Sequence, residues 1–150
     1  MSQAAPQPPW SYRAPVRFTH TDPAGYVFFP RFFEMFQAAV EDWFNQHLGI
    51  DYAGLILRER IGFPTAHTEC DFLRPCRLGE TLELQLWLER VGGSSFCLRF
   101  DGRVGAQLRL RARSVLVTIS MHDGRPRPLP PALRERLHAY HASCLASIGA

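Results

Sequence analysis

Apolar and polar residues alternate along four stretches of this chain, and alternation with a period of two is typical of half-buried β-strands. In the stretches 81–89, 95–101 and 107–113, apolar residues stand at even positions and mostly polar or charged residues at odd positions. The stretch 12–21 alternates in the same way, and 64–72 also favours a strand. Glycine pairs or Asp-Gly pairs at 92–93 and 101–102 favour hairpin turns, so the last three strands are expected to form an antiparallel meander.

The spacing of apolar residues changes to that of a helix between the first two expected strands. Apolar side chains recur three or four positions apart over 30–47, Pro30 suits the first turn of a helix, and Gly49 is a typical stop signal. The stripe consists of Phe32, Phe33, Phe36, Val40, Trp43 and Phe44. So much aromatic surface cannot be left in water, and we expect a sheet to wrap around this helix.

The end of the chain predicts a second, amphipathic helix that starts near Pro131. Its buried side is expected to carry Leu133, Leu137, Tyr140, His141 and Leu145. Residues 1–9 are small, polar and rich in proline, which predicts a flexible tail before a single domain at 10–150. The order of strand, long helix, several strands and final helix predicts an α+β fold.

Composition excludes several classes of function. The chain has 150 residues, of which 46% are hydrophobic and 21% charged, as in an ordinary folded domain. The net charge of +3 gives no reason to expect nucleic acid or a membrane surface as partner. All 17 basic residues are arginines, so chemistry that requires a lysine is excluded. The four cysteines form no C-x-x-C pair, and we expect no metal site.

The N-terminus lacks the pattern of a signal peptide, and no apolar stretch is long enough to span a membrane. The cytoplasm is therefore the expected location.

The segment from His20 to Pro30 reads HTDPAGYVFFP and combines a carboxylate, two prolines and a glycine directly before the aromatic helix. It resembles the signature of the hot-dog-fold acyl-CoA thioesterases, in the branch typified by 4-hydroxybenzoyl-CoA thioesterase. Two shorter segments, Gly62-Phe63-Pro64 and Leu78-Gly79-Glu80, also resemble sequences of this family. The resemblance covers roughly residues 10–140, and it implies the hot-dog fold, in which a curved antiparallel sheet wraps a long central helix.

The resemblance also implies roles for two residues and an assembly. Asp22 matches the family's catalytic carboxylate, and Phe29 matches the position whose backbone N–H polarises the thioester carbonyl. Two protomers are expected to join their sheets edge to edge, with active sites at the seam, as a homodimer or as a homotetramer made of two dimers.

The chemistry of the residues supports these roles. A thiol leaving group has a pKa of about 8.5 and departs without a strong general acid, so one carboxylate and oxyanion donors are sufficient. An ionised Asp22 can attack the carbonyl as a nucleophile or activate a water as a general base, and the sequence leaves both routes open.

Further candidates surround this motif. His20 stands two residues before Asp22 and would lie on the same side of a continuing strand, where it could tune the carboxylate. Gln37 stands where the 4-hydroxybenzoyl enzyme carries an acidic residue near the substrate hydroxyl. In another thioesterase branch a helix glutamate is catalytic, which makes Glu34 the fallback. Additional residues expected to bind substrate are Gly25, Tyr26, Phe28, Phe33, His67 and Ser94.

The phosphates of coenzyme A are expected at the hairpin 90–95, where Ser94 and backbone N–H groups stand in for the basic residues of typical members. The row of Arg109, Arg111 and Arg113 is an alternative binding site for the phosphates, although such a row is more often the solvent-exposed face of a strand.

Hydrolysis of an acyl-CoA thioester needs no cofactor, since coenzyme A is part of the substrate, and an aromatic or a short to medium acyl group is expected. Two alternatives remain. The domain could be a non-catalytic module that binds CoA or an acyl carrier, or a hydratase or dehydratase of the same fold, for which His20 and Asp22 are the only suitable pair. Replacing Asp22 by Asn separates a binding module from a hydrolase.

Overall fold

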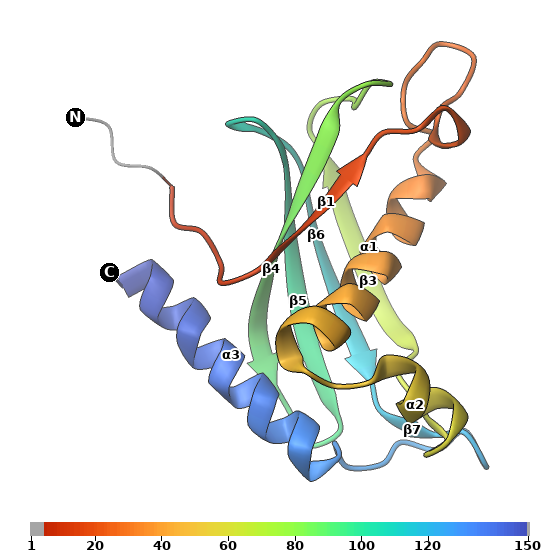
Figure 1. The fold of residues 1–150 in the computed structure, drawn as a ribbon, viewed down its shortest axis with the longest axis vertical. Helices are drawn as coiled ribbons and strands as arrows, with labels where there is room; N and C mark the ends of the chain where they lie inside the picture. The colour runs from red at the N-terminus through yellow and green to blue at the C-terminus, as the bar shows by residue number, and fades with distance from the viewer. Residues whose placement is uncertain (1–4, 150) are drawn as a thin grey trace.

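The computed structural model describes residues 5–149, which form one antiparallel sheet, a long helix packed against it, and a C-terminal helix (Figure 1). The five-stranded sheet has the order β1-β4-β5-β6-β3, and a two-stranded sheet pairs β2 with β7. The elements are β1 (Ser11–Pro15), η1 (Phe18–His20), α1 (Pro30–Asp42), η2 (Trp43–Leu48), α2 (Tyr52–Leu57), β2 (Ile61–Gly62), β3 (Thr65–Phe72), β4 (Thr81–Val91), β5 (Ser95–Val104), β6 (Gln107–Val117), β7 (Ile119–Ser120) and α3 (Pro131–Gly149).

The core lies between α1 and the face of the sheet that carries the even-numbered residues of β4, β5 and β6. The ring of Phe36 on α1 stacks on Phe100 of β5, with centroids 4.9 Å apart. Trp43 and Phe44 are fully buried, and both rings contact Phe96. The predicted α+β class, with the aromatic helix held by the sheet, is confirmed.

The first strand is shorter than predicted. β1 ends at Pro15, and residues 18–20 form a single 3-10 turn in place of the expected strand end. The backbone N–H of Arg17 donates to Nδ1 of His20 over 2.9 Å, and the Thr21 hydroxyl donates to the Phe18 carbonyl, so local hydrogen bonds close the turn. Phe18, which the alternation placed inside, is 80% exposed.

The hairpin after β5 also differs from the prediction. The pair Asp101-Gly102 lies within β5, and the turn comes later, at Gly105, whose φ is +60°. Gly102 pairs with both neighbouring strands, and a Cβ on it would meet Cγ of Leu110 at 2.7 Å. This glycine therefore makes room for a core leucine and does not serve a turn.

The long helix ends where the sequence predicts, because Gly49 adopts a left-handed φ of +67° after Leu48. Its last stretch, η2, is wound as a π-helix, which the periodicity does not reveal. The short elements α2, β2 and β7 were also missed, since elements of two to six residues carry too little periodicity to detect.

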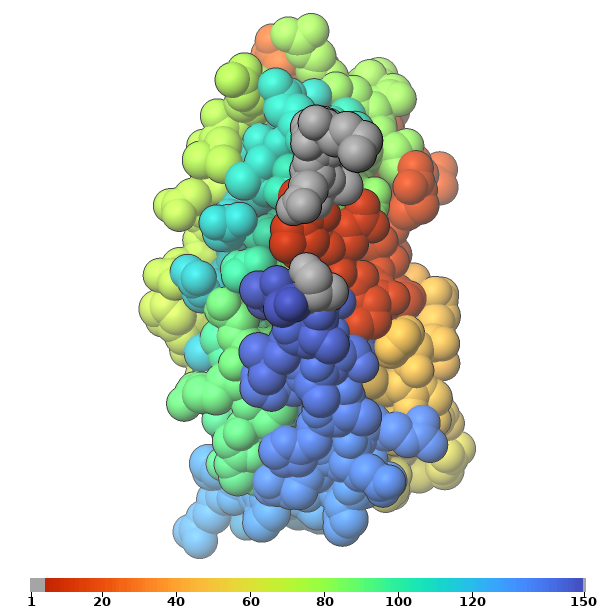
Figure 2. Space-filling model, turned by 90° about the vertical axis from the view of Figure 1, so that its left-hand side faces the viewer, coloured from red at the N-terminus to blue at the C-terminus, as the bar shows by residue number. Residues whose placement is uncertain are grey.

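The C-terminal helix α3 packs against the part of β4 that follows Gln85, which is the last β4 residue paired with β1. The Tyr140 hydroxyl donates to the carbonyl of Leu86 over 2.6 Å, while the Leu86 N–H donates to the carbonyl of Trp10. Figure 2 shows α3 next to the N-terminal segment on this side of the molecule. Cys144 is buried and Leu145 is 56% exposed, contrary to the prediction, because residue 144 lies one helical turn after Tyr140.

Two further observations concern residues 5–149. None of their helices combines the length and the apolar character that a membrane crossing requires. They also hold no group of three or more His, Cys, Asp or Glu side chains placed to bind a metal ion. Residues 1–4 of the expected flexible tail lie outside the described residues, and residues 5–8 carry no helix or strand.

Candidate active site

The segment that carries the motif forms a tight loop before α1. The Asp22 N–H donates to the Tyr26 carbonyl over 2.9 Å, and the Gly25 N–H donates to the Asp22 carbonyl over 3.0 Å. Gly25 has a φ of +82°, which other residues rarely adopt. Backbone hydrogen bonds from Val27 to Cys76 and from Leu78 to Gly25 tie the loop to the segment before β4. The loop is therefore fixed from both sides.

Asp22 is a half-buried residue, and its two carboxylate oxygens make different contacts. Oδ1 accepts the N–H of Ala24 at 2.9 Å and the N–H of Tyr26 at 3.3 Å, which is the geometry of an Asx-turn. Oδ2 accepts no hydrogen bond from any of residues 5–149. One oxygen holds the loop while the other is available for chemistry.

The start of α1 leaves a backbone donor free at Phe29. The Phe28 N–H donates to the carbonyl of His20, and the N–H groups of Arg31 and Phe32 donate to the carbonyls of Phe28 and Phe29. Pro30 has no N–H. The Phe29 N–H meets no acceptor within the described part of the chain, and it lies at the positive end of the helix dipole.

His20 is not brought onto the side of Asp22 by a continuing strand, since the strand ends earlier. Its Nδ1 accepts the Arg17 N–H, and among residues 5–149 no hydrogen bond or ion pair joins its ring to Asp22. The ring lines a separate hollow that also contains Glu34, whose carboxylate accepts a hydrogen bond from Arg31 at 2.7 Å.

Aromatic side chains form an exposed patch beside the loop. Phe28, Phe29 and Phe72 are 50%, 58% and 46% exposed, and their rings are in edge contact, with centroids 5.8 Å and 6.3 Å apart. Leu73 follows and is 54% exposed. Phe72 ends β3, which is an edge strand of the sheet, and no strand of residues 5–149 pairs with its outer side. An apolar patch at a free sheet edge is typical of a surface that a ligand or a second chain covers.

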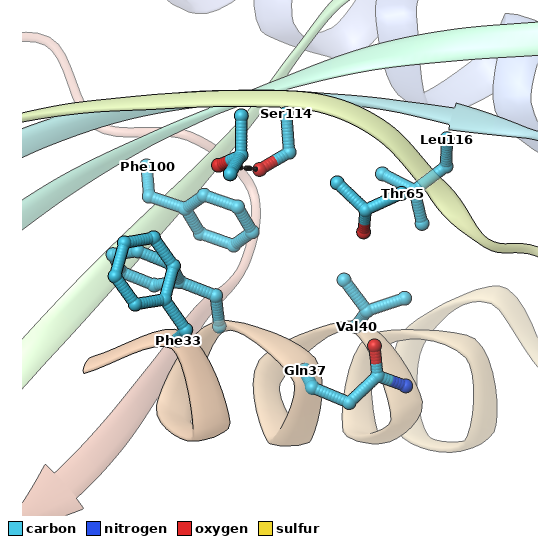
Figure 3. A pocket seen from close by; sticks show the side chains of 9 residues that line it. Phe33, Gln37, Val40, Thr65, Phe100, Ser114 and Leu116 are labelled. Atoms are coloured by element: carbon cyan, nitrogen blue, oxygen red, sulfur yellow. Dashed lines mark hydrogen bonds between the residues drawn. The ribbon is translucent and has the colours of Figure 1, made fainter. Parts of the chain in front are cut away.

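A cavity of about 240 Å³ lies between α1 and the sheet, and it is lined by two predicted substrate residues, Phe33 and Gln37 (Figure 3). Tyr26 and Phe28 are not part of its lining. The sheet contributes polar residues that the sequence analysis missed, because in β3 and β6 nothing distinguishes a Thr or Ser at a cavity from one at the surface. The remaining lining residues are Phe36, Val40, Thr65, Thr68, Phe100, Ser114 and Leu116.

The β4–β5 hairpin lies at the end of the sheet opposite the loop before α1 (Figure 1). There Ser94 lines an open groove of about 550 Å³ together with Arg127 and Arg134. The Arg134 guanidinium donates to the Gly93 carbonyl over 2.6 Å and so sits against the β4–β5 hairpin. Both arginines are more than 30 residues away from Ser94 in the chain, so the sequence alone did not predict them at this groove. His67 does not share this groove; its Nε2 lies 4.0 Å from the Glu69 carboxylate on β3.

The arginine row on β6 is occupied by ion pairs. Arg109, Arg111 and Arg113 each lie 2.8 Å from a carboxylate oxygen, those of Glu80, Asp101 and Glu89 respectively. The Arg109 guanidinium lowers the pKa of Glu80 below its ordinary value. These pairs fit the reading of a solvated strand face better than that of a phosphate platform.

Comparison with known proteins places the chain among thioesterases. The model of the thioesterase-like superfamily matches residues 16–137. The 1,4-dihydroxy-2-naphthoyl-CoA hydrolase of Synechocystis is 29% identical over 124 residues, which are 81% of this chain and 88% of the relative. The enzyme of the same name from Acaryochloris marina is 30% identical over 125 residues, which are 81% of this chain and 90% of the relative.

Solved structures agree with the sequence comparison. The crystal structure of the Synechocystis 1,4-dihydroxy-2-naphthoyl-CoA thioesterase superposes with a TM-score of 0.78 at 26% identity, and the match covers 85% of this chain and 94% of that one. The expected hot-dog fold is thereby confirmed.

Proposed function

This chain belongs to the thioesterase-like superfamily and is a hydrolase of CoA thioesters, and we propose that it cleaves an aromatic acyl-CoA with Asp22 as its catalytic carboxylate. The assignment of Asp22 rests on the different contacts of its two carboxylate oxygens. Oδ1 is bound by the loop, while Oδ2 accepts no hydrogen bond from residues 5–149.

The proposed reaction follows from this geometry and the free amide at Phe29. The thioester oxygen accepts the Phe29 N–H, which stabilises the negative charge that develops when the carbonyl carbon is attacked. In one route Oδ2 of Asp22 attacks, the C–S bond breaks, CoA leaves as thiolate, and water hydrolyses the resulting anhydride. In the other route Oδ2 takes a proton from a water that attacks directly. Both routes yield the free acid and CoA.

An aromatic acyl group is supported by the cavity beside α1. Phe33, Phe36 and Phe100 give it flat apolar walls, and its volume suits one or two fused rings better than a long alkyl chain. The relatives named above act on 1,4-dihydroxy-2-naphthoyl-CoA, which is an aromatic thioester.

We propose that a homodimer, or a tetramer of two such dimers, completes the site. If β3 pairs antiparallel with β3 of a second copy, the end of one sheet that carries the Asp22 loop comes beside the opposite end of the partner sheet. That end carries the groove with Ser94, Arg127 and Arg134, whose cationic and N–H groups suit the phosphates of coenzyme A. The pairing would also cover the aromatic patch at Phe72.

Water is the only co-reactant that this hydrolysis requires, so we propose no cofactor and no metal. The cytoplasmic location remains a prediction.

A panel of aryl and alkyl CoA thioesters tests the proposed function, with release of CoA thiol as the readout. We expect wild-type protein to hydrolyse aryl thioesters with the highest kcat/KM, and Asp22→Asn to lose most turnover while still binding CoA. A protein that hydrolyses no member of the panel would overturn the proposal. Equal turnover by wild type and Asp22→Asn would remove Asp22 from the mechanism.

A further inference from the structure

Three arginine side chains lie around one carboxylate at the end of the sheet that is next to the loop before α1. Figure 1 shows the β3–β4 connection and the start of β6 at this end. The two segments border an open pocket of about 210 Å³. This pocket is separate from the cavity beside α1, with which it shares no residue. Its lining residues are Arg74, Pro75, Arg77, Glu80, Gln107 and Arg109.

The carboxylate of Glu80 is already compensated by Arg109. The Arg109 guanidinium donates to Oε1 over 3.0 Å and to Oε2 over 2.8 Å, and Oε1 also accepts the backbone N–H of Arg77 at 2.7 Å. Arg109 donates to the carbonyl of Pro75 as well, over 2.7 Å, and its side chain is only 12% exposed. This ion pair therefore forms a fixed wall of the pocket, and its two charges balance.

The guanidinium groups of Arg74 and Arg77 are not balanced in this way. Within residues 5–149, neither group takes part in an ion pair or donates a side-chain hydrogen bond. The guanidinium carbon of Arg77 lies over the ring of Tyr26, 5.5 Å from its centroid. Gln107 adds a carboxamide with two N–H donors. The pocket therefore has two uncompensated positive charges and several unused donors.

These groups suit a phosphate dianion. A phosphomonoester carries a charge of about −1.5 to −2 at pH 7, which matches the excess of positive charge, whereas a carboxylate carries only one negative charge. The planar fork of a guanidinium also fits two phosphate oxygens at once. The charge of the pocket and the geometry of its donors thus favour the same class of ligand.

The pocket also borders the segment that holds the loop before α1. The carbonyl of Cys76 accepts the Val27 N–H at 2.9 Å, and the Leu78 N–H donates to the Gly25 carbonyl over 3.0 Å. Arg77 lies between these two points of attachment. A ligand that joins Arg77 to β6 would therefore restrain the loop as well.

We propose that this pocket binds a phosphate dianion, either free phosphate or the phosphomonoester of a small molecule, through Arg74, Arg77 and Gln107. Bound phosphate links the β3–β4 connection to β6 and thereby restrains the loop before α1. The inference goes beyond the proposed function and does not depend on it, because phosphate binding is measured without a thioester.

Calorimetric titration of the full chain with inorganic phosphate tests the site, with acetate at equal ionic strength as the comparison. We expect wild type to bind phosphate with a Kd on the order of 1 mM or below, and acetate at least about tenfold more weakly. Arg74→Gln and Arg77→Gln should each weaken phosphate binding about tenfold or more, because each removes charge-assisted hydrogen bonds.

The matched control is Arg60→Gln, which removes an exposed arginine outside the pocket and should leave phosphate binding unchanged. Unfolding temperatures without phosphate show whether each variant is folded. Phosphate binding no stronger than that of acetate would overturn the inference. Equal binding by wild type, Arg74→Gln and Arg77→Gln would overturn it too. Neither result would affect the proposed hydrolysis, which the panel of thioesters tests separately.

Competition with two nucleotides identifies the source of the phosphate. Displacement of phosphate by CoA, but not by dephospho-CoA, would assign the pocket to the 3′-phosphomonoester of CoA, which dephospho-CoA lacks. Displacement by neither would assign it to free phosphate or to another small phosphomonoester. Both results support a phosphate site at Arg74 and Arg77.

Hydrogen exchange measures the effect on the loop. We expect saturating phosphate to slow the exchange of the Val27 and Leu78 amides several-fold in wild type, but not in Arg77→Gln. Exchange rates in wild type that stay the same when phosphate is bound would contradict the restraint of the loop.

Discussion

The Oδ1 atom of Asp22 accepts the backbone N–H of Ala24 at 2.9 Å, so the residue proposed to perform the chemistry also builds the turn that positions it. Asparagine can form the same turn through its carbonyl oxygen, but it carries no charge. The two roles of the side chain can therefore be separated by two substitutions.

We expect Asp22→Asn to keep its unfolding temperature and to lose about 10²–10⁴-fold in kcat, the usual contribution of a positioned acid–base group. Asp22→Ala loses the same activity and also the turn, which is expected to cost about 1 kcal/mol of stability. Steady-state kinetics and thermal unfolding of both variants check this. Comparable activity of Asp22→Asn and wild type contradicts the assignment.

Because the backbone N–H of Phe29 has no acceptor among residues 5–149, we expect that removing this N–H slows hydrolysis more than removing the side chain does. Phe29 has a φ of −54°, which proline can adopt, so Phe29→Pro removes the N–H at a compatible angle. Phe29→Ala removes the ring but keeps the N–H and serves as the control. We expect Phe29→Pro to be about 10²–10³-fold slower in kcat than Phe29→Ala. Equal rates of the two variants, both folded by circular dichroism, would rule out this oxyanion donor.

The exposed residues at the end of β3 predict an interface. Leu73→Asp puts a charge into the apolar patch, and we expect it to shift the protein to a monomer and to abolish most of the activity. Leu57 on α2 is 71% exposed and lies outside the patch, so Leu57→Asp is the matched control. Light scattering after size exclusion gives the mass. A Leu73→Asp protein with the wild-type mass would argue against the proposed pairing.

The ion pair of Glu80 and Arg109 predicts a pH-dependent contribution to stability. The pair lowers the pKa of Glu80, so its stabilisation is fully present above the ordinary glutamate pKa of 4.5 and is lost as pH falls through the lowered value. Glu80→Gln should reduce the free energy of unfolding by about 1 kcal/mol at pH 7.

Denaturant unfolding from pH 7 to pH 3 measures this difference, which should shrink in the acidic half of the range. The exposed Glu59→Gln is the control and should show little change at any pH. A difference between Glu80→Gln and wild type that stays constant with pH would contradict the ion-pair explanation.

Removing the buried hydroxyl of Tyr140 is expected to lower stability but not catalytic activity. In Tyr140→Phe the Leu86 carbonyl loses its hydrogen-bond donor, at the part of β4 that packs against α3 and is no longer paired with β1. We expect the free energy of unfolding to fall by about 1–2 kcal/mol, with kcat/KM unchanged. Unfolding curves and kinetics of the purified variant give both quantities, and an unchanged stability would mean that another donor reaches this carbonyl.

Much of the fold could be predicted from the sequence, because the period of apolar residues reflects which face of an element is buried. The three meander strands, the aromatic helix up to Gly49 and the final helix all follow from this period. The errors occur where local hydrogen bonds or a close packing contact outweigh the period. Residues 18–20 turn away from the sheet, and Gly102 serves the packing of Leu110 in place of a hairpin.

The sequence by itself also determined the motif around Asp22, since those residues are neighbours in the chain and the loop they form is local. Only the tertiary structure decided what faces the cavity between α1 and the sheet. Gln37 is oriented by Tyr52, 15 positions away, and Ser114 bonds Thr68, 46 positions away. Such pairs depend on how α1, α2 and the sheet pack in three dimensions, and the packing of distant segments leaves no periodic trace in one sequence.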